Sequence, residues 1–435
     1  MDDPGDLRDV EAGSLVDRPG NVRRFLGRMA IDVRPLRESP QFRRLWVGQS
    51  ISLIGSQISF VAIPYQVYEL THSTFFVGLI ALCELIPLLT LAVVGGAIAD
   101  AVDRRRLILV TEVGLVIVTV FLAFNASLAE PKVWPLFFVA TAATALWALG
   151  SPAMRSLTPH LVPEDQFAAA SALNGVYSNM AAVAGPAVGG ILIATIGLTA
   201  TYLIDVGTYA ASLVSILMLK PAPPAPDAER ASVRTILEGF RFVRRTPVIM
   251  GIFLLDTNAM IFGMPSALFP ALADERFDAG AEVVGFLYAA PYGGALLAVL
   301  LSGWIQHVRR QGLAVALAAS AWGLAIVGVG FAESLWLCLL LLAAAGAADN
   351  ISAVLRSTIV LTLTPKHMLG RVSGMELAQV ASAPALGNLE AGILASLTSL
   401  RFSIVSGGFA CIAGCVVILA AIPSLLRYDS KNPRA

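Results

Sequence analysis

Long apolar blocks separated by short polar breaks run along most of this chain. Twelve blocks can be placed, at about residues 44–67, 75–99, 106–128, 133–155, 167–195, 199–219, 247–271, 283–305, 312–332, 335–359, 370–397 and 402–426. Each block has the roughly twenty residues that a helix needs to cross about 30 Å of hydrocarbon. Because the blocks are continuously apolar, they predict membrane-spanning helices rather than the alternating strands of a membrane barrel. The predicted fold class is an all-α membrane protein.

Polar stretches divide the chain into five segments. We expect a cytoplasmic N-terminal tail over residues 1–43, a six-helix bundle over 44–219, a cytoplasmic linker over 220–246, a second six-helix bundle over 247–426 and a cytoplasmic tail over 427–435. The linker begins with a proline-rich stretch that ends the preceding helix, because proline lacks the amide hydrogen that a helix uses. Later in the linker, residues 232–245 have the pattern of an amphipathic helix at the membrane surface.

The two bundles are predicted to be copies of one unit. A shift of 202 residues aligns Gly190 with Gly392, and a slightly different offset aligns Gly78 with Gly285. The two copies enter the membrane from the same side, so an axis along the membrane normal relates them. Parallel repeats of this kind place a substrate site between the halves, near the midplane.

Composition and charge support this assignment and give it an orientation. Hydrophobic residues make up 57% of the sequence and charged residues 14%, compared with about a quarter charged in a soluble domain. With a cytoplasmic N-terminus, all but three of the 30 lysines and arginines lie on the cytoplasmic side, the exceptions being Lys132, Arg276 and Arg401. Since Lys and Arg accumulate on that side, we expect a multi-pass protein of the inner (plasma) membrane with both termini in the cytoplasm.

Sites for metals, nucleotides or covalent catalysis are not predicted. The four cysteines lie inside apolar blocks and the four histidines are scattered, so no metal-ligand spacing is present. The sequence has no Gly-x-x-x-x-Gly-Lys-Ser/Thr phosphate loop, so this chain alone is not expected to use ATP. We expect a non-enzyme without a cofactor, powered by the proton gradient. It should act as a monomer in the lipid bilayer on a small-molecule substrate, with no nucleic-acid partner.

A charged hairpin separates the second and third blocks. Residues 96–105 read Gly-Ala-Ile-Ala-Asp-Ala-Val-Asp-Arg-Arg. This segment resembles the loop between helices 2 and 3 of the major facilitator superfamily of secondary transporters, whose pattern is Gly-x-Leu-Ala-Asp-Arg-x-Gly-Arg-Arg. Ala101 and Asp103 depart from that pattern. The resemblance, with the twelve blocks and the central linker, implies the major facilitator fold over residues 41–427 and transport by alternating access.

The hairpin and two nearby charges suggest a gate on the cytoplasmic side. Glu112 lies near the start of the third block and Arg155 at the end of the fourth, both on the cytoplasmic side. We expect a charge cluster, intact only when the inner gate is shut, that consists of Asp100, Arg104, Arg105, Glu112 and Arg155. The alternative is that the arginines only set the topology.

A small-residue motif lies in the fifth block. Gly185, Pro186, Gly189 and Gly190 resemble the "antiporter" motif of the family's exporters. Proline bends the helix and the glycines permit close contact with a neighbour, so a simple helix crossing is the alternative. Residues 268–274, 284–290 and 364–374 further resemble the branch that contains the enterobactin (siderophore) exporter and related multidrug exporters. That likeness implies export rather than import.

Acids inside the apolar blocks are candidates for carrying protons, because an ionisable group within the membrane is costly and usually functional. Asp256 comes first, since it lies about nine residues into its block and hence near the midplane. Glu390, Glu84 and Asp349 follow. Asp349 shares a helix face with Arg356, and an ion pair between them with a third partner is possible. The alternative for Asp256 is a hydrogen bond to a neighbouring helix, and the alternative for Glu84 is a position at the outer interface.

Aromatic and polar residues within the blocks are candidates for lining a substrate cavity, which usually combines rings with a few polar groups. These candidates are Gln57, Tyr65, Trp147, Tyr177, Asn179, Asn258, Tyr288, Tyr292, Arg356 and Gln379. Lipid-facing or packing positions are the alternative for each ring.

The function predicted from the sequence is that of a proton-coupled secondary transporter that exports a siderophore or a lipophilic drug-like molecule. The first alternative is a proton-coupled importer or symporter of a small metabolite, which the fold and the repeat fit equally well. The second is a non-transporting membrane receptor or assembly factor on the same scaffold. Buried acids argue against the second, because a passive scaffold has little reason to retain them.

Overall fold

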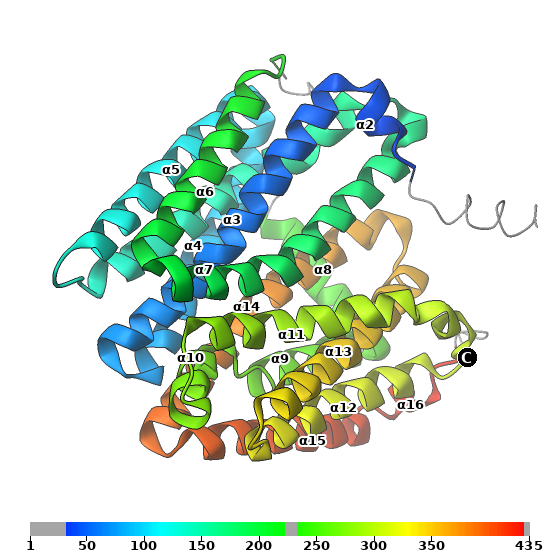
Figure 1. Cartoon of the computed structure of the whole chain (residues 1–435). Coiled ribbons are helices and arrows are strands. Elements are labelled where there is room, and N and C mark those ends of the chain that lie inside the picture. Colours follow the sequence, from blue (N-terminus) through cyan, green and yellow to red (C-terminus); the bar gives the residue numbers. More distant parts are fainter. Residues whose placement is uncertain (1–31, 222–232, 430–435) are drawn as a thin grey trace, which may run out of the picture.

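A computed structural model describes residues 32–221 and 233–429, and these residues form helices and short connections without a strand. The N-terminal bundle lies above the C-terminal bundle in Figure 1. Three parts of the predicted segments fall outside the described residues: positions 1–31 of the N-terminal tail, 222–232 of the linker and 430–435 of the C-terminal tail.

The N-terminal bundle follows a short helix α2 (Arg34–Glu38). It contains α3 (Pro40–Thr71), α4 (Thr74–Ala101), α5 (Arg104–Ser127), α6 (Trp134–Leu161), the 3₁₀ turn η1 (Glu164–Gln166) and α7 (Phe167–Leu217). The linker contributes α8 (Val233–Arg245), as the amphipathic pattern predicts.

The C-terminal bundle begins at α9 (Pro247–Phe262). It continues with η2 (Ser266–Leu268), α10 (Phe269–Ala271), η3 (Leu272–Arg276), α11 (Ala281–Leu300), η4 (Ser302–His307), α12 (Gln311–Phe331) and α13 (Leu335–Leu363). The last elements are η5 (Lys366–Met368), α14 (Leu369–Leu397), α15 (Leu400–Ala421) and α16 (Pro423–Arg427).

Eleven helical segments of the described chain are long and apolar enough to cross a membrane. One of them, Glu164–Leu217, has 54 residues, which would make a helix of about 80 Å, too long for one crossing. Gly197 divides it, with φ of 80° and ψ of 167° in the middle of α7. Glycine tolerates this conformation because it has no Cβ. The described residues therefore make twelve crossings in two sets of six.

The helices begin where the sequence supplies a cap. Ser39, Ser334 and Ser399 accept a hydrogen bond from the first turn of α3, α13 and α15. Asp103, which departs from the family's hairpin pattern, caps α5 by accepting from the amide of Arg106 at 3.0 Å. Such a cap satisfies an amide that has no partner within the helix.

The seventh crossing differs from the continuous helix predicted over residues 247–271. α9 ends at Phe262, and Gly263, Met264 and Pro265 interrupt it before a chain of short 3₁₀, α and π turns. Pro265 cannot donate a backbone hydrogen bond, and it disfavours a helical conformation in the residue before it. A broken helix at membrane depth requires other partners for its backbone, and Trp322 provides one by donating to the Gly263 carbonyl oxygen at 2.7 Å.

The two ends of the molecule carry different elements. The "linker end" holds α2, α8 and α16, and the "distal end" holds the connections 72–73, 128–133, 277–280, 332–334 and 398–399. In Figure 1, α2 and α16 lie on the right and α10 on the left, so the crossings run between right and left.

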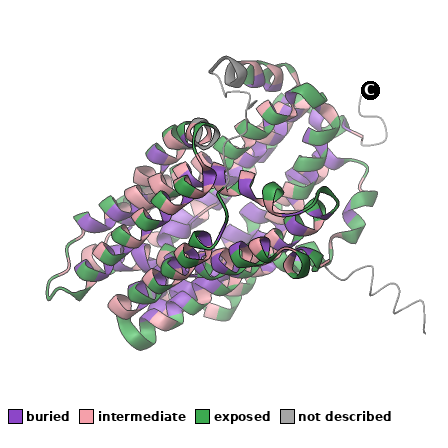
Figure 2. Ribbon diagram, turned by 90° about the horizontal axis from the view of Figure 1, so that it is seen from above, coloured by how far each residue is buried: buried purple, intermediate pink, exposed green. Residues whose placement is uncertain are grey.

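Large apolar side chains cover the outside of the bundles. Trp336, Leu397 and Leu300 are 80%, 77% and 72% exposed. Figure 2 shows buried residues toward the inside of the assembly and exposed ones along its outer surfaces. An apolar outer surface on a helical bundle is expected where lipid is the solvent, and the chain is a multi-pass membrane protein.

Candidate functional site

The two bundles meet at the distal end through two glycine crossings. At the first, a Cβ added to Gly190 on α7 would lie 2.9 Å from the Gly285 Cα on α11. At the second, a Cβ added to Gly392 on α14 would lie 3.3 Å from the Gly78 Cα on α4, and Thr74 donates to the Gly392 carbonyl oxygen at 3.1 Å. The repeat aligns Gly78 with Gly285 and Gly190 with Gly392, so the crossings are equivalent when the bundles are exchanged.

The same four helices part toward the linker end. Each carries a second glycine nearer that end: Gly175 on α7, Gly96 on α4, Gly293 on α11 and Gly374 on α14. A Cβ added to any of these four meets no atom within 4 Å. The space between the bundles is therefore closed at the distal end and open at the linker end.

The exporter-like motif of α7 serves both bundles. Gly185 packs on the side chain of Gln57, and Gly189 packs on the backbone of Ile58, both on α3 of the same bundle. Pro186 is buried, and its carbonyl oxygen faces α11 of the other bundle. The motif thus fixes α3 against α7 and also forms half of the first crossing.

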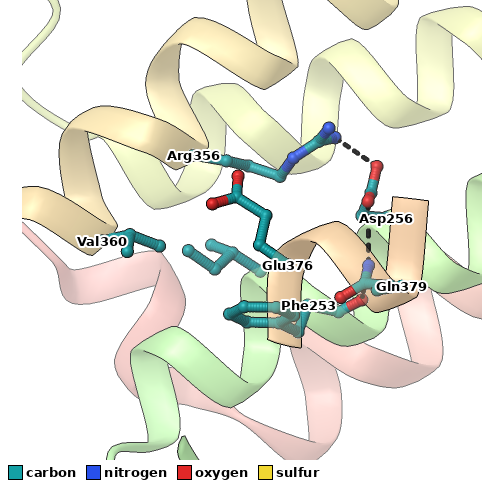
Figure 3. A pocket seen from close by; sticks show the side chains of 7 residues that line it. Phe253, Asp256, Arg356, Val360, Glu376 and Gln379 are labelled. Carbon is teal, nitrogen blue, oxygen red and sulfur yellow. Dashed lines mark hydrogen bonds and ion pairs between the residues drawn. The ribbon is translucent and has the colours of Figure 1, made fainter. Parts of the chain in front are cut away.

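An ion-pair cluster joins three helices of the C-terminal bundle (Figure 3). Arg356 Nη1 on α13 lies 2.6 Å from Asp256 Oδ1 on α9 and 3.9 Å from Asp349 Oδ1 on α13. Gln379 on α14 donates to Asp256 Oδ2 at 2.8 Å and to the carbonyl oxygen of Phe253 at 2.9 Å. The side chains of Asp256 and Arg356 are 5% and 13% exposed, so this pair is largely shielded from water.

Glu376 on α14 is a third acid of this cluster that sequence reasoning missed. It lines the same cavity as Asp256, Arg356 and Gln379, and Figure 3 shows its carboxylate directed toward Arg356. The available signal was its spacing of three residues from Gln379, which places both on one helix face.

Glu84 lies in a separate cavity of about 60 Å³ between the bundles, near the distal end. Phe60 and other apolar residues of α3 and α4 form one wall, and Ser266, Tyr288 and Asn388 form the other. These polar residues are connected, since Asn388 Oδ1 accepts from Ser266 Oγ at 2.7 Å and the Tyr288 hydroxyl donates to the Ser266 carbonyl oxygen at 3.0 Å. These residues also provide hydrogen-bond partners for the backbone of the interrupted seventh crossing.

Glu390 does not join the ion-pair cluster. It is half-buried on α14, and it lies 14 residues beyond Glu376, or about 21 Å along the helix axis. The structure therefore brings together Asp256, Asp349 and Arg356, while Glu84 and Glu390 lie nearer the distal end.

The predicted gate residues are spread over several contacts in this conformation. Arg104 is buried and its Nη1 lies 3.2 Å from His160 Nε2. Arg105 donates to the carbonyl oxygens of Ile216 and Leu217 at the end of α7, at 3.1 and 2.7 Å.

Glu112 is also buried, and its Oε1 accepts from Gln49 at 3.1 Å. Arg155 is exposed, and the side chain of Asp100 lies outside the described residues. Because the linker end is open here, a cluster that forms only when that end shuts is not expected to be assembled.

The remaining cavity candidates divide into three groups. Tyr65 and Tyr177 are half-buried, and Trp147, Asn179 and Tyr292 are exposed. Asn258 faces α15 instead, since it donates to the Cys411 carbonyl oxygen at 2.7 Å.

Comparison with known proteins agrees with this architecture. Residues 31–433 match the family model described as transmembrane secretion effector, a division of the major facilitator superfamily. The enterobactin exporter EntS of Shigella boydii serotype 4 (strain Sb227) is 32% identical over 400 residues, which cover 92% of this chain and 96% of that protein. The same exporter from Escherichia coli O81 (strain ED1a) is 31% identical over the same shares.

Solved structures are similar in fold at low sequence identity. The nucleoside transporter NupG matches with a TM-score of 0.71 and 12% identity, over 88% of this chain and 98% of that one. A bacterial homologue of the lysosomal transporter Spinster, inward-facing and unoccupied, matches with a TM-score of 0.68 and 14% identity, over 89% and 96%. These likenesses confirm the predicted fold of two six-helix bundles.

Proposed function

The chain belongs to the transmembrane secretion effectors of the major facilitator superfamily, and we propose that it exports a siderophore in exchange for protons. The observation that carries the proposal is the buried Asp256–Arg356 pair, with Asp349 3.9 Å from the same guanidinium and Glu376 in the same cavity. The similarity to enterobactin exporters over 92% of the chain supports the cargo class and the direction.

Proton coupling follows from competition at this cluster. While Asp256 is ionised, the pair offers a carboxylate acceptor and guanidinium donors to the polar groups of a cargo molecule. Protonating Asp256 removes the charge that lies 2.6 Å from Arg356, and this interaction is strong because it is shielded from water. A proton and a cargo molecule that compete for one carboxylate cannot be carried together, which is the condition for exchange.

The conformation described here is the one expected to load cargo. Arginines of α8 and of the hairpin gather at the linker end, so we assign this end to the cytoplasm and the protein to the inner (plasma) membrane. The Asp256–Arg356 pair is intact while the space between the bundles is open toward the cytoplasm. Binding of cargo there, followed by separation of the distal crossings, would release it on the other side.

We further propose that transport needs no cofactor and no catalytic step, and that one copy of the chain is sufficient. The two bundles already supply both halves of the distal closure and the complete cluster. The proton gradient would supply the energy, with Asp256 as the principal site and Asp349 and Glu376 modulating the charge that Arg356 meets.

The test uses the full chain reconstituted in liposomes with an inside-acid pH gradient. Wild type and Asp256→Asn are compared for uptake of enterobactin, and Glu130→Gln is the matched control, because its carboxylate is 87% exposed and pairs with Lys132. We expect wild type and the control to accumulate cargo, and Asp256→Asn to lose accumulation while it still exchanges cargo without a gradient. Accumulation by Asp256→Asn at the wild-type level would refute the proton site, and accumulation driven only by an inside-alkaline gradient would indicate import.

A further inference from the structure

A second group of buried acids lies in the N-terminal bundle, away from the ion-pair cluster. Asp205 on α7 has no exposed surface and Glu112 on α5 is 6% exposed. Among the described residues neither acid forms an ion pair with a cation, whereas Asp256 has Arg356. An ionised carboxylate without a cation is very costly inside a membrane bundle. The burial of these two acids therefore needs an explanation other than an ion pair.

Asp205 belongs to a polar seam, defined here as four side-chain pairs between α3 and α7. Its members are Gln66 with Tyr202, Ser59 with Asp205, Ser56 with Tyr209 and Gln49 with Ser212. The α7 members follow one another at spacings of three and four residues, which places them on one face of that helix. Gln49 also donates to Glu112 Oε1 at 3.1 Å, which connects the end of the seam to α5.

Two hydroxyl groups surround the Asp205 carboxyl group. Thr208 donates to the Asp205 backbone carbonyl oxygen at 2.8 Å or to Oδ1 at 3.1 Å, and Ser59 is the partner of Oδ2. Because a hydroxyl group accepts as well as donates, either partner can receive the hydrogen of a neutral carboxyl group.

Space around the seam excludes a compensating ion. The Cα of Gly55 on α3 approaches Thr208 and the Asp205 carboxyl so closely that a Cβ there would overlap both. The nearest titratable groups on the packed elements are Tyr202, Tyr209 and Glu112, which carry no positive charge. The arginines at the linker end are engaged elsewhere: Arg44 and Arg105 donate to the carbonyl oxygens of Met218, Ile216 and Leu217.

We infer that the polar seam is a second proton-binding site, with the proton on Asp205 in this distal-closed conformation. Glu112, whose Oε2 has no hydrogen-bond partner among the described residues, is the other buried acid of this region, and Gln49 links it to the seam. Loss of the Asp205 proton would place a bare charge between α3 and α7 and loosen their contact. The site shares no residue with the Arg356 cluster.

The test compares two asparagine variants of the full chain, purified in detergent. Asn is a close match for a neutral carboxyl group, so Asp205→Asn should unfold near the wild-type temperature. Asp256→Asn is the matched control and should unfold at a lower temperature, because it leaves Arg356 without its nearest acid. Equal destabilisation by both variants would overturn the inference.

Infrared difference spectra give a second, independent readout. Wild type minus Asp205→Asn should show the carbonyl band of a protonated carboxyl group, and the band should shift in Thr208→Ala, which removes one of the two hydroxyl partners of that group. If Asp205→Asn does not fold, Thr208→Ala still decides the point. A carboxylate band in either difference, or no shift in Thr208→Ala, would refute a proton on Asp205.

Discussion

Substituting Gly190 by alanine should open the distal end. The added Cβ would lie 2.9 Å from the Gly285 Cα and 3.0 Å from its nitrogen. Both are backbone atoms, so the clash cannot be relieved by turning a side chain. Overpacking of this kind costs about 1–3 kcal/mol, which corresponds to roughly a 5- to 150-fold change in an equilibrium constant. Because the contact exists only while the distal end is closed, the whole cost falls on that state.

The assay is labelling of a reporter cysteine from the distal side. Val77→Cys suits this purpose, since Val77 is 3% exposed and lines the cavity near the crossings. A membrane-impermeant thiol reagent is added to that side only, and the labelling rate should rise in Gly190→Ala. Gly175→Ala is the control, because it adds the same methyl group to α7 where no atom lies within 4 Å. Equal labelling rates for Gly190→Ala and Gly175→Ala would show that the contact between Gly190 and Gly285 does not hold the distal end closed.

Three further predictions concern the second glycine crossing, the cap of α5 and the hydrogen bond to Asp256. Gly392→Ala at the second crossing should raise distal labelling as Gly190→Ala does, and the double variant should show roughly the product of the two effects; no effect of Gly392→Ala would break the proposed equivalence of the crossings. Asp103→Ala should lower the free energy of unfolding by about 0.5–2 kcal/mol through loss of the α5 cap, measured by denaturant unfolding, and an unchanged value would deny the cap. Gln379→Leu should weaken proton-driven uptake by removing the donor to Asp256 Oδ2, and wild-type uptake at every pH would show that this bond does not matter.

The membrane-spanning helices and the repeat could be predicted from the sequence for a physical reason. Continuous apolar blocks have few alternatives in lipid, since only a helix satisfies its own backbone there. The repeat likewise matched Gly78 with Gly285 and Gly190 with Gly392 before any contact was known. These are the residues that the structure places at the two distal crossings.

The partners of the buried acids could not be predicted in the same way. Asp256 and Arg356 are 100 positions apart, and their ion pair depends on how α9 packs on α13. Glu376 was missed because it lies near the end of its block, where an acid is usually a surface residue. The break after Phe262 was also missed, since the residues on both sides are apolar and the compensating Trp322 and Asn388 come from other helices.

The gate at the hairpin stays a prediction. Its residues meet carbonyl oxygens, His160 or Gln49 in the conformation described here, in which the linker end is open. Testing it requires the opposite conformation, which Gly190→Ala should populate.

The most direct test of exchange at Asp256 is the direction of proton movement caused by cargo alone. Liposomes that contain the full chain and an internal pH dye are prepared without a pH gradient, and enterobactin is added outside. We expect protons to leave the liposomes as cargo enters, and Asp256→Asn to abolish this proton movement. Protons that enter together with the cargo, or an equal flux in Asp256→Asn, would contradict exchange at Asp256.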